Sequence, residues 1–393
     1  MSEDDDSLPS FSQSSNAQSS SVSGPQQFNA PVDVPSILIN DSDNEDIIVG
    51  AINDKISGDP SHSDGAVISS LMEKLRSIMR HDEEEPCQIL RLYQSLFLQG
   101  RQLDADETMA VEDGEGSHIF VSRANPLETA AEEMLGLENI RFPLCVQFYG
   151  ETALDTGGPR RDFFRIMIQA MMEKNIFEEK ENNVTLCKNE SLVHKQWYYV
   201  CGLVVGLSCL EGGDNIHLKE ELLTEIGTDI YTKQFQQGLC KCGIMKLLTA
   251  FPVLKYIWTN PANRIVTVGK LLNNFKVNFS PEGSNSRKDE ERAYSIFVSY
   301  VREVAGAGRK DFISINLQSI LAYITGNSSI PVLGFNPLAT ISFQADNGAF
   351  LPQAHTCINQ FVLSRVQHGA NPETVKRGLD WAFSSMDFGA ENV

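Results

Sequence analysis

The run from Trp197 to Leu210 contains no charged residue, and it places the strongest limit on how this chain folds. Its apolar side chains leave no polar stripe, so a helix formed here needs other elements around every side. The run is too short for a bilayer, which takes about 20 residues of helix. We therefore predict a buried helix at 196–210, inside a globular core.

The first 60 residues cannot build a comparable core. They hold 11 acidic and one basic side chain, and they are rich in Ser, Gln, Asn, Pro and Asp. Such a composition buries too little apolar area to offset the entropy of ordering. We predict a disordered acidic tail over 1–65. The net charge of −20 also argues against nucleic acid or an anionic membrane as a partner, because phosphate binding depends on Lys and Arg.

Beyond the tail, the apolar spacing predicts α+β structure. Two helical patterns and an acidic linker occupy 66–117, and strands and helices mix from residue 118 onward. We expect strands at 118–121, 142–149, 330–333 and 340–343, and helices at 126–137, 159–173, 219–230, 235–247 and 292–304. The polar, turn-forming tract at 280–290 indicates a linker.

The eight cysteines include no CxxC pair, and the acidic start of the chain has the wrong charge for a secretory signal. These features predict an intracellular protein with free thiols, in the nucleus or the cytoplasm. Cys240 and Cys242 could form half of a metal site, or they could be two ordinary thiols. The nearest histidine is His217, and no second pair has zinc-finger spacing, so we expect no metal and no cofactor.

Two segments carry the candidate functional residues. In the first, at 148–164, a strand ends at a glycine and paired glycines lead into a helix that begins with proline. Its candidate residues are Gly150, Glu151, Asp155, Gly157, Gly158 and Arg161. Glycines permit backbone angles that a Cβ would forbid, so the pattern favours an architectural role for this corner over a functional one.

The second segment, at 348–359, places Cys357 in a loop. The thiolate is the reactive form of cysteine, and a partly exposed loop with polar neighbours favours it. His355 and Thr356 lie within reach to orient or hydrogen-bond an acyl intermediate. A buried structural cysteine is the alternative, and a Cys close to a His does not by itself decide between the two.

Together, these segments resemble the HECT family of ubiquitin ligases. Residues 148–164 are similar to that family's GE…DxGGxxRxFF corner, and 324–335 are similar to its TG…IP…GF run. Residues 351–357, Leu-Pro-Gln-Ala-His-Thr-Cys, resemble the loop that carries its active-site cysteine. The segments occur in the family's order, and the resemblance extends over residues 118–393.

The resemblance implies a bilobal α+β domain behind the acidic tail. The larger, mostly helical N-lobe would span 118–279, a hinge 280–290, and a smaller α/β C-lobe 291–393. Ubiquitin would arrive as a thioester on a ubiquitin-conjugating enzyme, pass to Cys357, and then pass to a lysine of a protein substrate. One thioester replaces another at nearly equal free energy, so proximity and oxyanion stabilisation are the protein's main contributions.

Residues near the carboxyl end complete the implied site. Phe388 resembles the phenylalanine that the family keeps there to seat the lobe that bears the thioester. Asp387 and Glu391 are acidic and close in sequence, so they are candidates to deprotonate the substrate lysine.

Two departures from the family open an alternative function. The N-lobe region is shorter than usual, with the missing length expected where the conjugating enzyme docks, and Phe361–Ser364 stands where the family usually has Leu-Pro. The alternative is a catalytically weak or inactive HECT-like module that binds ubiquitin or a partner protein. The intact cysteine loop favours the enzyme.

A further motif lies in the tail. Ile37, Leu38 and Ile39 precede an acidic, serine-containing run within 36–49. This segment resembles a SUMO-interacting motif, which adds a strand to the edge of the SUMO sheet and places its acids against basic residues. A chance aliphatic triplet is the alternative. The motif would add SUMO to the implied partners.

Overall fold

The computed structural model describes residues 64–79, 85–104, 114–152, 155–180, 183–224, 227, 229–260, 265–309, 315–346 and 348–384. All of them belong to one compact unit, Gly58–Val393. Their buried apolar side chains form two large clusters and a smaller one. The buried members of the first large cluster end at Trp258, and those of the second begin at Val266.

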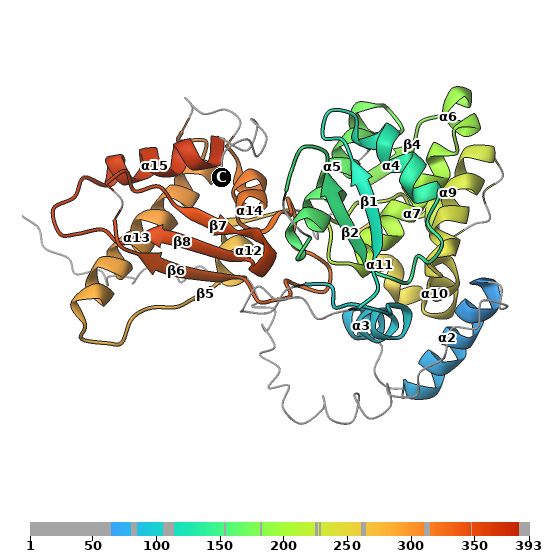
Figure 1. Ribbon diagram of the computed structural model, residues 1–393, viewed down its shortest axis with the longest axis horizontal. Coiled ribbons are helices and arrows are strands. Elements are labelled where there is room, and N and C mark those ends of the chain that lie inside the picture. Colours follow the sequence, from blue (N-terminus) through green and yellow to red (C-terminus); the bar gives the residue numbers. More distant parts are fainter. Residues whose placement is uncertain are drawn as a thin grey trace, which may run out of the picture. The chain divides into compact units, whose positions relative to one another are not determined.

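The first cluster is built mostly by helices, with two small sheets (Figure 1). Its elements are α2 (Asp64–Ile78), α3 (Pro86–Phe97), β1 (Ser117–Val121), α4 (Pro126–Leu135), β2 (Leu144–Phe148), α5 (Gly158–Glu173), β3 (Phe177–Lys180), β4 (Asn183–Leu186), α6 (Glu190–His194), α7 (Trp197–Leu210), α8 (Glu221–Thr224), α9 (Ile230–Lys241), α10 (Ile244–Ala250), η1 (Pro252–Leu254) and α11 (Lys255–Thr259). β1 and β2 pair in parallel, and β3 and β4 pair antiparallel.

Helix α7 is buried on every side, as its uncharged sequence predicts. All its residues except Tyr199 are buried. Helix α9 lies alongside it, and the two backbones touch where Gly202 faces Gly238. A Cβ on either glycine would overlap with the backbone of the other helix. The prediction of a buried helix at 196–210 is therefore confirmed, and glycine explains how closely its neighbour approaches.

The second cluster packs helices on a four-stranded sheet (Figure 1). Its elements are α12 (Val268–Asn273), β5 (Lys276–Val277), α13 (Asn285–Ala305), α14 (Leu317–Thr325), β6 (Thr340–Gln344), β7 (Gln353–His355), η3 (Thr356–Ile358), β8 (Gln360–Ser364) and α15 (Pro372–Ser384). The strand order is β5-β6-β8-β7. β7 runs antiparallel to β8, while β6 runs parallel to β8 and to β5. Strands and helices together make the fold α+β.

The tract predicted as a hinge at 280–290 belongs with the second cluster. Helix α13 starts at Asn285, earlier than the predicted 292, because the Ser284 side chain accepts a hydrogen bond from the backbone N–H of Arg287 and caps the helix. Glu290 is buried and binds both Ser280 and Arg365. These contacts fix the tract to the sheet whose strands β7 and β8 lie on either side of Cys357 in the chain.

Three local predictions are corrected by the structure. No strand forms at 330–333, where Pro331 has no N–H and the carbonyl oxygen of Leu333 accepts from the side chain of Arg91 at 2.8 Å. Among the described residues of the helix expected at 219–230, helix forms in the short α8 and at Ile230, where α9 begins. The helix expected at 235–247 is split into α9 and α10, because Gly243 adopts a φ of 73° between them.

Within the described residues, no helix is both long enough and apolar enough to cross a membrane.

Candidate functional site

Asp155 holds the corner between β2 and α5. One of its carboxylate oxygens accepts a hydrogen bond from the N–H of Gly157, and the other accepts one from Val146, both at 2.8 Å. The carboxylate thus joins the first turn of the helix to the preceding strand, where the helix dipole favours negative charge. Gly157 has a φ of 111°, which a residue with a Cβ rarely adopts. The identities of Asp155 and Gly157 therefore follow from the local geometry.

Gly150 and Glu151 form the other half of this corner. Gly150 turns the chain with a φ of 83°. Arg123 donates a hydrogen bond to Glu151 at 3.2 Å and pairs with Asp162 of α5 at 2.5 Å. These contacts tie the end of β1 to α5, so Glu151 serves the architecture of the corner.

Arg160 is completely buried, and carboxylates balance its charge. Its guanidinium pairs with Asp104 at 2.7 Å and lies 3.6 Å from Glu211. Burial acts to lower the pKa of Arg160, but Asp104, Asp155 and Glu211 together raise it above its usual value. Burial raises the pKa of Glu211 to about 7, and within the described structure its Oε1 has no hydrogen-bond partner. Glu211 is therefore the least compensated charge of the group.

Arg161, the next residue of α5, reaches the turn that carries Cys357. Its Nη2 donates to the carbonyl oxygens of Thr356 and Cys357, the latter at 3.1 Å. Its Nε donates to the carbonyl oxygen of Thr325 at 3.0 Å, and its Nη1 pairs with Asp104. Burial lowers the pKa of this guanidinium, yet arginine remains charged in proteins. Arg161 thus links α5 to α14 and to the Cys357 turn.

Gly158 brings the backbone of α5 against the same turn. A Cβ at this position would lie 2.6 Å from Oγ1 of Thr356 and 3.2 Å from Sγ of Cys357. The first distance is too short for any side chain, so only glycine permits this approach. The paired glycines therefore differ in purpose: Gly157 supplies an unusual backbone angle, and Gly158 supplies closeness to Cys357.

Cys357 lies on η3, a single turn between β7 and β8. Asn359 ends this turn with a left-handed backbone at a φ of 51°, and its side-chain amide donates to the carbonyl oxygen of Pro337 at 2.8 Å. The thiol of Cys357 is free and the residue is partly exposed. The sheet therefore fixes both ends of the turn and leaves the cysteine accessible.

The two neighbours of Cys357 that the sequence singles out lie in different surroundings. Thr356 faces Gly158, and its carbonyl oxygen is bound by Arg161. His355 is the last residue of β7, where it pairs with Gln360 of β8 and is partly exposed. Their expected roles beside an acyl intermediate stay predictions.

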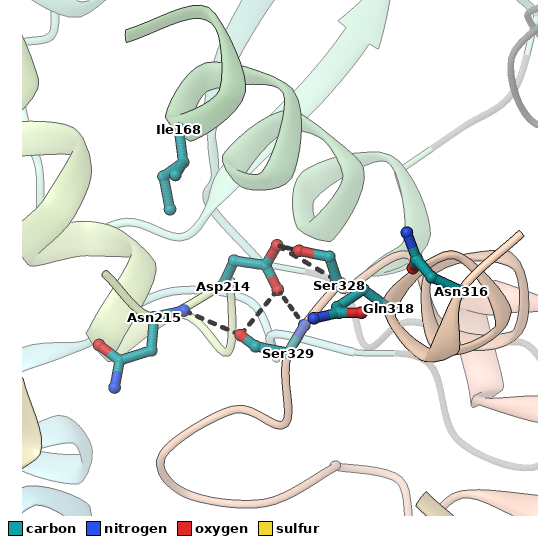
Figure 2. Close-up of a pocket in the computed structure, with 7 residues that line it drawn as sticks. All are labelled: Ile168, Asp214, Asn215, Asn316, Gln318, Ser328 and Ser329. Carbon is teal, nitrogen blue, oxygen red and sulfur yellow. Dashed lines mark hydrogen bonds between the residues drawn. The ribbon is translucent and has the colours of Figure 1, made fainter. Parts of the chain in front are cut away.

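Asp214, which follows α7, is a buried charge that binds the loop after α14 (Figure 2). Asp214 accepts hydrogen bonds from the backbone N–H groups of Ser328 and Ser329, at 3.1 and 2.9 Å, and from both serine hydroxyls. Burial raises the pKa of Asp214, and these hydrogen bonds act against that rise. The carboxylate faces a cavity of about 300 Å³ that is also lined by Ile168, Asn215, Asn316 and Gln318.

Another cavity, of about 260 Å³, adjoins Arg161. Asp104, Asn359 and Arg91 contribute to its lining. Within the described structure, Oδ1 of Asn359 has no hydrogen-bond partner, although the residue is fully buried. The packing around Asn359, at the end of the Cys357 turn, is therefore incomplete on this side.

The Cys240 and Cys242 thiols lie in different environments. Cys240 is exposed at the end of α9, whereas Cys242 is buried, and burial raises the pKa of both thiols. This difference is typical of separate thiols. Across the part of the chain that the structure describes, no group of three or more His, Cys, Asp or Glu side chains is arranged to hold a metal ion.

Several sequence candidates lie outside the described residues. They are Ile37, Leu38 and Ile39 of the tail, and Asp387, Phe388 and Glu391 near the carboxyl end.

The ion pairs around α5 were missed by sequence reasoning. Asp104 belongs to a stretch that reads as an acidic linker, and the motif that singles out Arg161 gives no signal for Arg160. One signal was present: Glu211 directly follows the uncharged run that forms α7. A charge at the end of a fully buried helix has to find a partner inside the protein.

Residues 216–388 match the model of a protein family, the HECT-domain (ubiquitin-transferase). The match includes the Cys357 turn; it supports a HECT-type ubiquitin-transferase role and fits the α+β architecture. The corner at 148–164 precedes the matched span, so its likeness to the family rests on its sequence motif. No curated protein matches the chain.

Proposed function

We propose that this chain is a ubiquitin-protein ligase that carries ubiquitin as a thioester on Cys357. The observation that supports this most is a free thiol, on a partly exposed residue in a single turn within the family match. The positive charge of Arg161 lies beside the turn, where negative charge develops during acyl transfer.

In the first step, the Cys357 thiolate attacks the carbonyl carbon of the thioester between ubiquitin and the conjugating enzyme. A new carbon–sulfur bond forms, the old one breaks, and the cysteine of the conjugating enzyme leaves as a thiolate. The two thioesters have nearly equal free energy, so the protein accelerates the step by proximity and by stabilising the oxyanion. Thr356 and backbone N–H groups of the turn are the candidates for that stabilisation, with His355 close by in the chain.

In the second step, the amine of a substrate lysine attacks the Cys357 thioester. An isopeptide bond forms and Cys357 leaves as a thiolate. The attacking amine must be neutral, so a base has to take its proton. Asp387 and Glu391 are the candidates for that base, and Phe388 is the candidate for seating the C-terminal lobe.

A thioester assay on the full chain tests this function, with ubiquitin, its activating enzyme and a panel of conjugating enzymes. We expect the wild type to form a ubiquitin adduct that a thiol reductant cleaves. Cys357→Ala should form none, and Cys357→Ser should form an oxyester that resists the reductant and is cleaved by alkali. Cys240→Ala removes an exposed thiol elsewhere and is the matched control, expected to behave as the wild type.

Two outcomes would contradict the proposal. One is the absence of an adduct with every conjugating enzyme of the panel, which would favour the alternative, a HECT-like module that binds ubiquitin or a partner protein without transferring it. The other is an adduct that persists in Cys357→Ala.

SUMO-bearing proteins are the substrates that we expect the tail to select. The support is the order of Ile37, Leu38 and Ile39 before an acidic run. A peptide of residues 30–55 should bind SUMO, and replacing the three aliphatic residues with alanine should abolish binding in a titration. Equal affinity of the two peptides would refute the motif. A location in the nucleus or cytoplasm stays a prediction.

A further inference from the structure

We infer that Arg161 is a positioning residue for Cys357, and that it holds the catalytic turn against α5 in the arrangement that receives ubiquitin. This inference rests on the proposed function. It extends that function to the α5 corner, which lies before the span that matches the family. The corner would then serve the reaction as well as the fold.

The hydrogen bonds of Arg161 converge on the backbone around the reactive sulfur. One guanidinium nitrogen binds the carbonyl oxygens of Thr356 and Cys357, and Nε binds that of Thr325. A planar guanidinium presents its donors in a rigid fork, so it can hold several carbonyls in fixed relative positions. Asp104 pairs with the same guanidinium and orients it. The position of the Cys357 turn is therefore set from α5.

Gly158 supports the same conclusion independently of Arg161. It removes the Cβ that would otherwise collide with Thr356 and crowd the sulfur of Cys357. Its backbone does not have a positive φ, so an alanine there would be strained only by these contacts. Arg161 thus supplies hydrogen bonds to the Cys357 turn, and Gly158 supplies the space that the turn needs to approach α5.

The arrangement in which the Cys357 turn contacts α5 fits a state that can receive ubiquitin better than a state in which the reaction is blocked. Cys357 remains partly exposed while Arg161 and Gly158 contact its turn. A contact that blocked the reaction would bury the cysteine.

Three variants and a control test the inference. Arg161→Gln removes the charge and most of the donors, and Arg161→Lys keeps the charge without the fork. Gly158→Ala adds one methyl group, which would lie 2.6 Å from Oγ1 of Thr356 and 3.2 Å from Sγ of Cys357. The matched control is Gly269→Ala, because the nearest atom to a Cβ there is 4.0 Å away.

The first measurement is the rate at which iodoacetamide alkylates each cysteine of the full chain, followed by mass spectrometry at one pH. We expect Cys357 to react several times faster in Arg161→Gln and in Gly158→Ala than in the wild type or in Gly269→Ala. The buried thiols of Cys201, Cys209 and Cys242 report on unfolding and should stay unlabelled in all variants. This measurement needs no ubiquitin.

The second measurement is the rate of thioester formation with the charged conjugating enzyme. In Arg161→Gln and Gly158→Ala, kcat should fall about tenfold or more, because misplacing a nucleophile by a fraction of an ångström has effects of this order. KM for the conjugating enzyme should change little, since neither residue is proposed to bind it. Arg161→Lys should retain part of the rate.

The combination of faster alkylation and slower ubiquitin transfer supports the inference. Unchanged alkylation of Cys357 in both variants would overturn it, because the turn would not be held by this contact. Faster alkylation together with equal or faster ubiquitin transfer would also overturn it, because the contact would then not promote the reaction. If the wild type forms no thioester, the proposed function fails, and faster alkylation in the variants would leave the contact with a structural role only.

Discussion

Glycine permits two close contacts in this protein, and the first lies between α7 and α9. A Cβ on Gly202 would overlap with the carbonyl oxygen of Phe235, and one on Gly238 would overlap with that of Tyr199. Both obstacles are backbone atoms, one on the buried helix α7 and one on α9, whose buried face packs against it. Neither helix can give way without disturbing the core around it, so this contact is rigid.

The second contact lies between α5 and the Cys357 turn. The two closest atoms that a Cβ on Gly158 would meet belong to the side chains of Thr356 and Cys357, on a single turn. Side chains can rotate or shift while the helix stays in place. The same residue type thus supports a fixed contact in one place and an adjustable contact in the other, and substitutions should separate the two.

Replacing Gly202 with alanine should have the largest effect on stability. The added methyl group has no space, so α7 and α9 must separate, with a loss of free energy of unfolding on the order of 3 kcal/mol. Urea unfolding followed by circular dichroism measures this loss. Gly158→Ala, measured in the same way, should lose far less. Equal losses for the two variants would remove the distinction between a rigid and an adjustable contact.

The two contacts also differ in what supports them. Apolar side chains surround α7 and α9, whereas the start of α5 is held by Arg160, Asp104 and Glu211. Apolar packing does not depend on pH, but a buried carboxylate does. Only the support of the α5 corner should therefore respond to pH.

Glu211 is the residue that should carry this response. Its pKa rises from 4.5 to about 7 in the folded protein, chiefly through burial. Between these values the folded state keeps the proton that the unfolded chain releases, so the free energy of unfolding falls as pH rises and levels off above about pH 7. In Glu211→Gln this fall should be absent, which favours the variant by about 3 kcal/mol above pH 7 relative to pH 4.5. Parallel pH profiles for the two proteins would contradict the assignment.

Much of the local structure was predictable because local signals determine it. The uncharged run at 197–210 predicted a buried helix, and the pattern that includes Asp155 and Gly157 predicted a corner. Ser284 could have placed the start of α13 correctly, since serine is a strong helix cap. The failed strand at 330–333 shows the opposite case: its aliphatic residues suit a strand, but Pro331 and a distant arginine determine its conformation.

In the candidate site, too, the parts set by local sequence were predictable and the parts set by distant contacts were not. The Cys357 loop could be found from its own residues and from its likeness to a family. Its contact with Arg161 could not, because the two are separated by 195 positions and an arginine in a helix has no sequence signal for its partner. The ion pair with Asp104 was hidden for the same reason, in a stretch whose composition resembles a linker.

A third glycine offers the smallest and most demanding test of this comparison. Gly269 lies in the first turn of α12, and no atom comes closer than 4.0 Å to a Cβ built on it. Alanine should therefore stabilise the protein slightly, by about 0.5 kcal/mol, because it lowers the entropy of the unfolded chain and favours the helix. The same urea titration measures the gain. A loss of stability would mean that the distance to the nearest atom does not decide how a glycine responds, and the contrast between Gly202 and Gly158 would then need another cause.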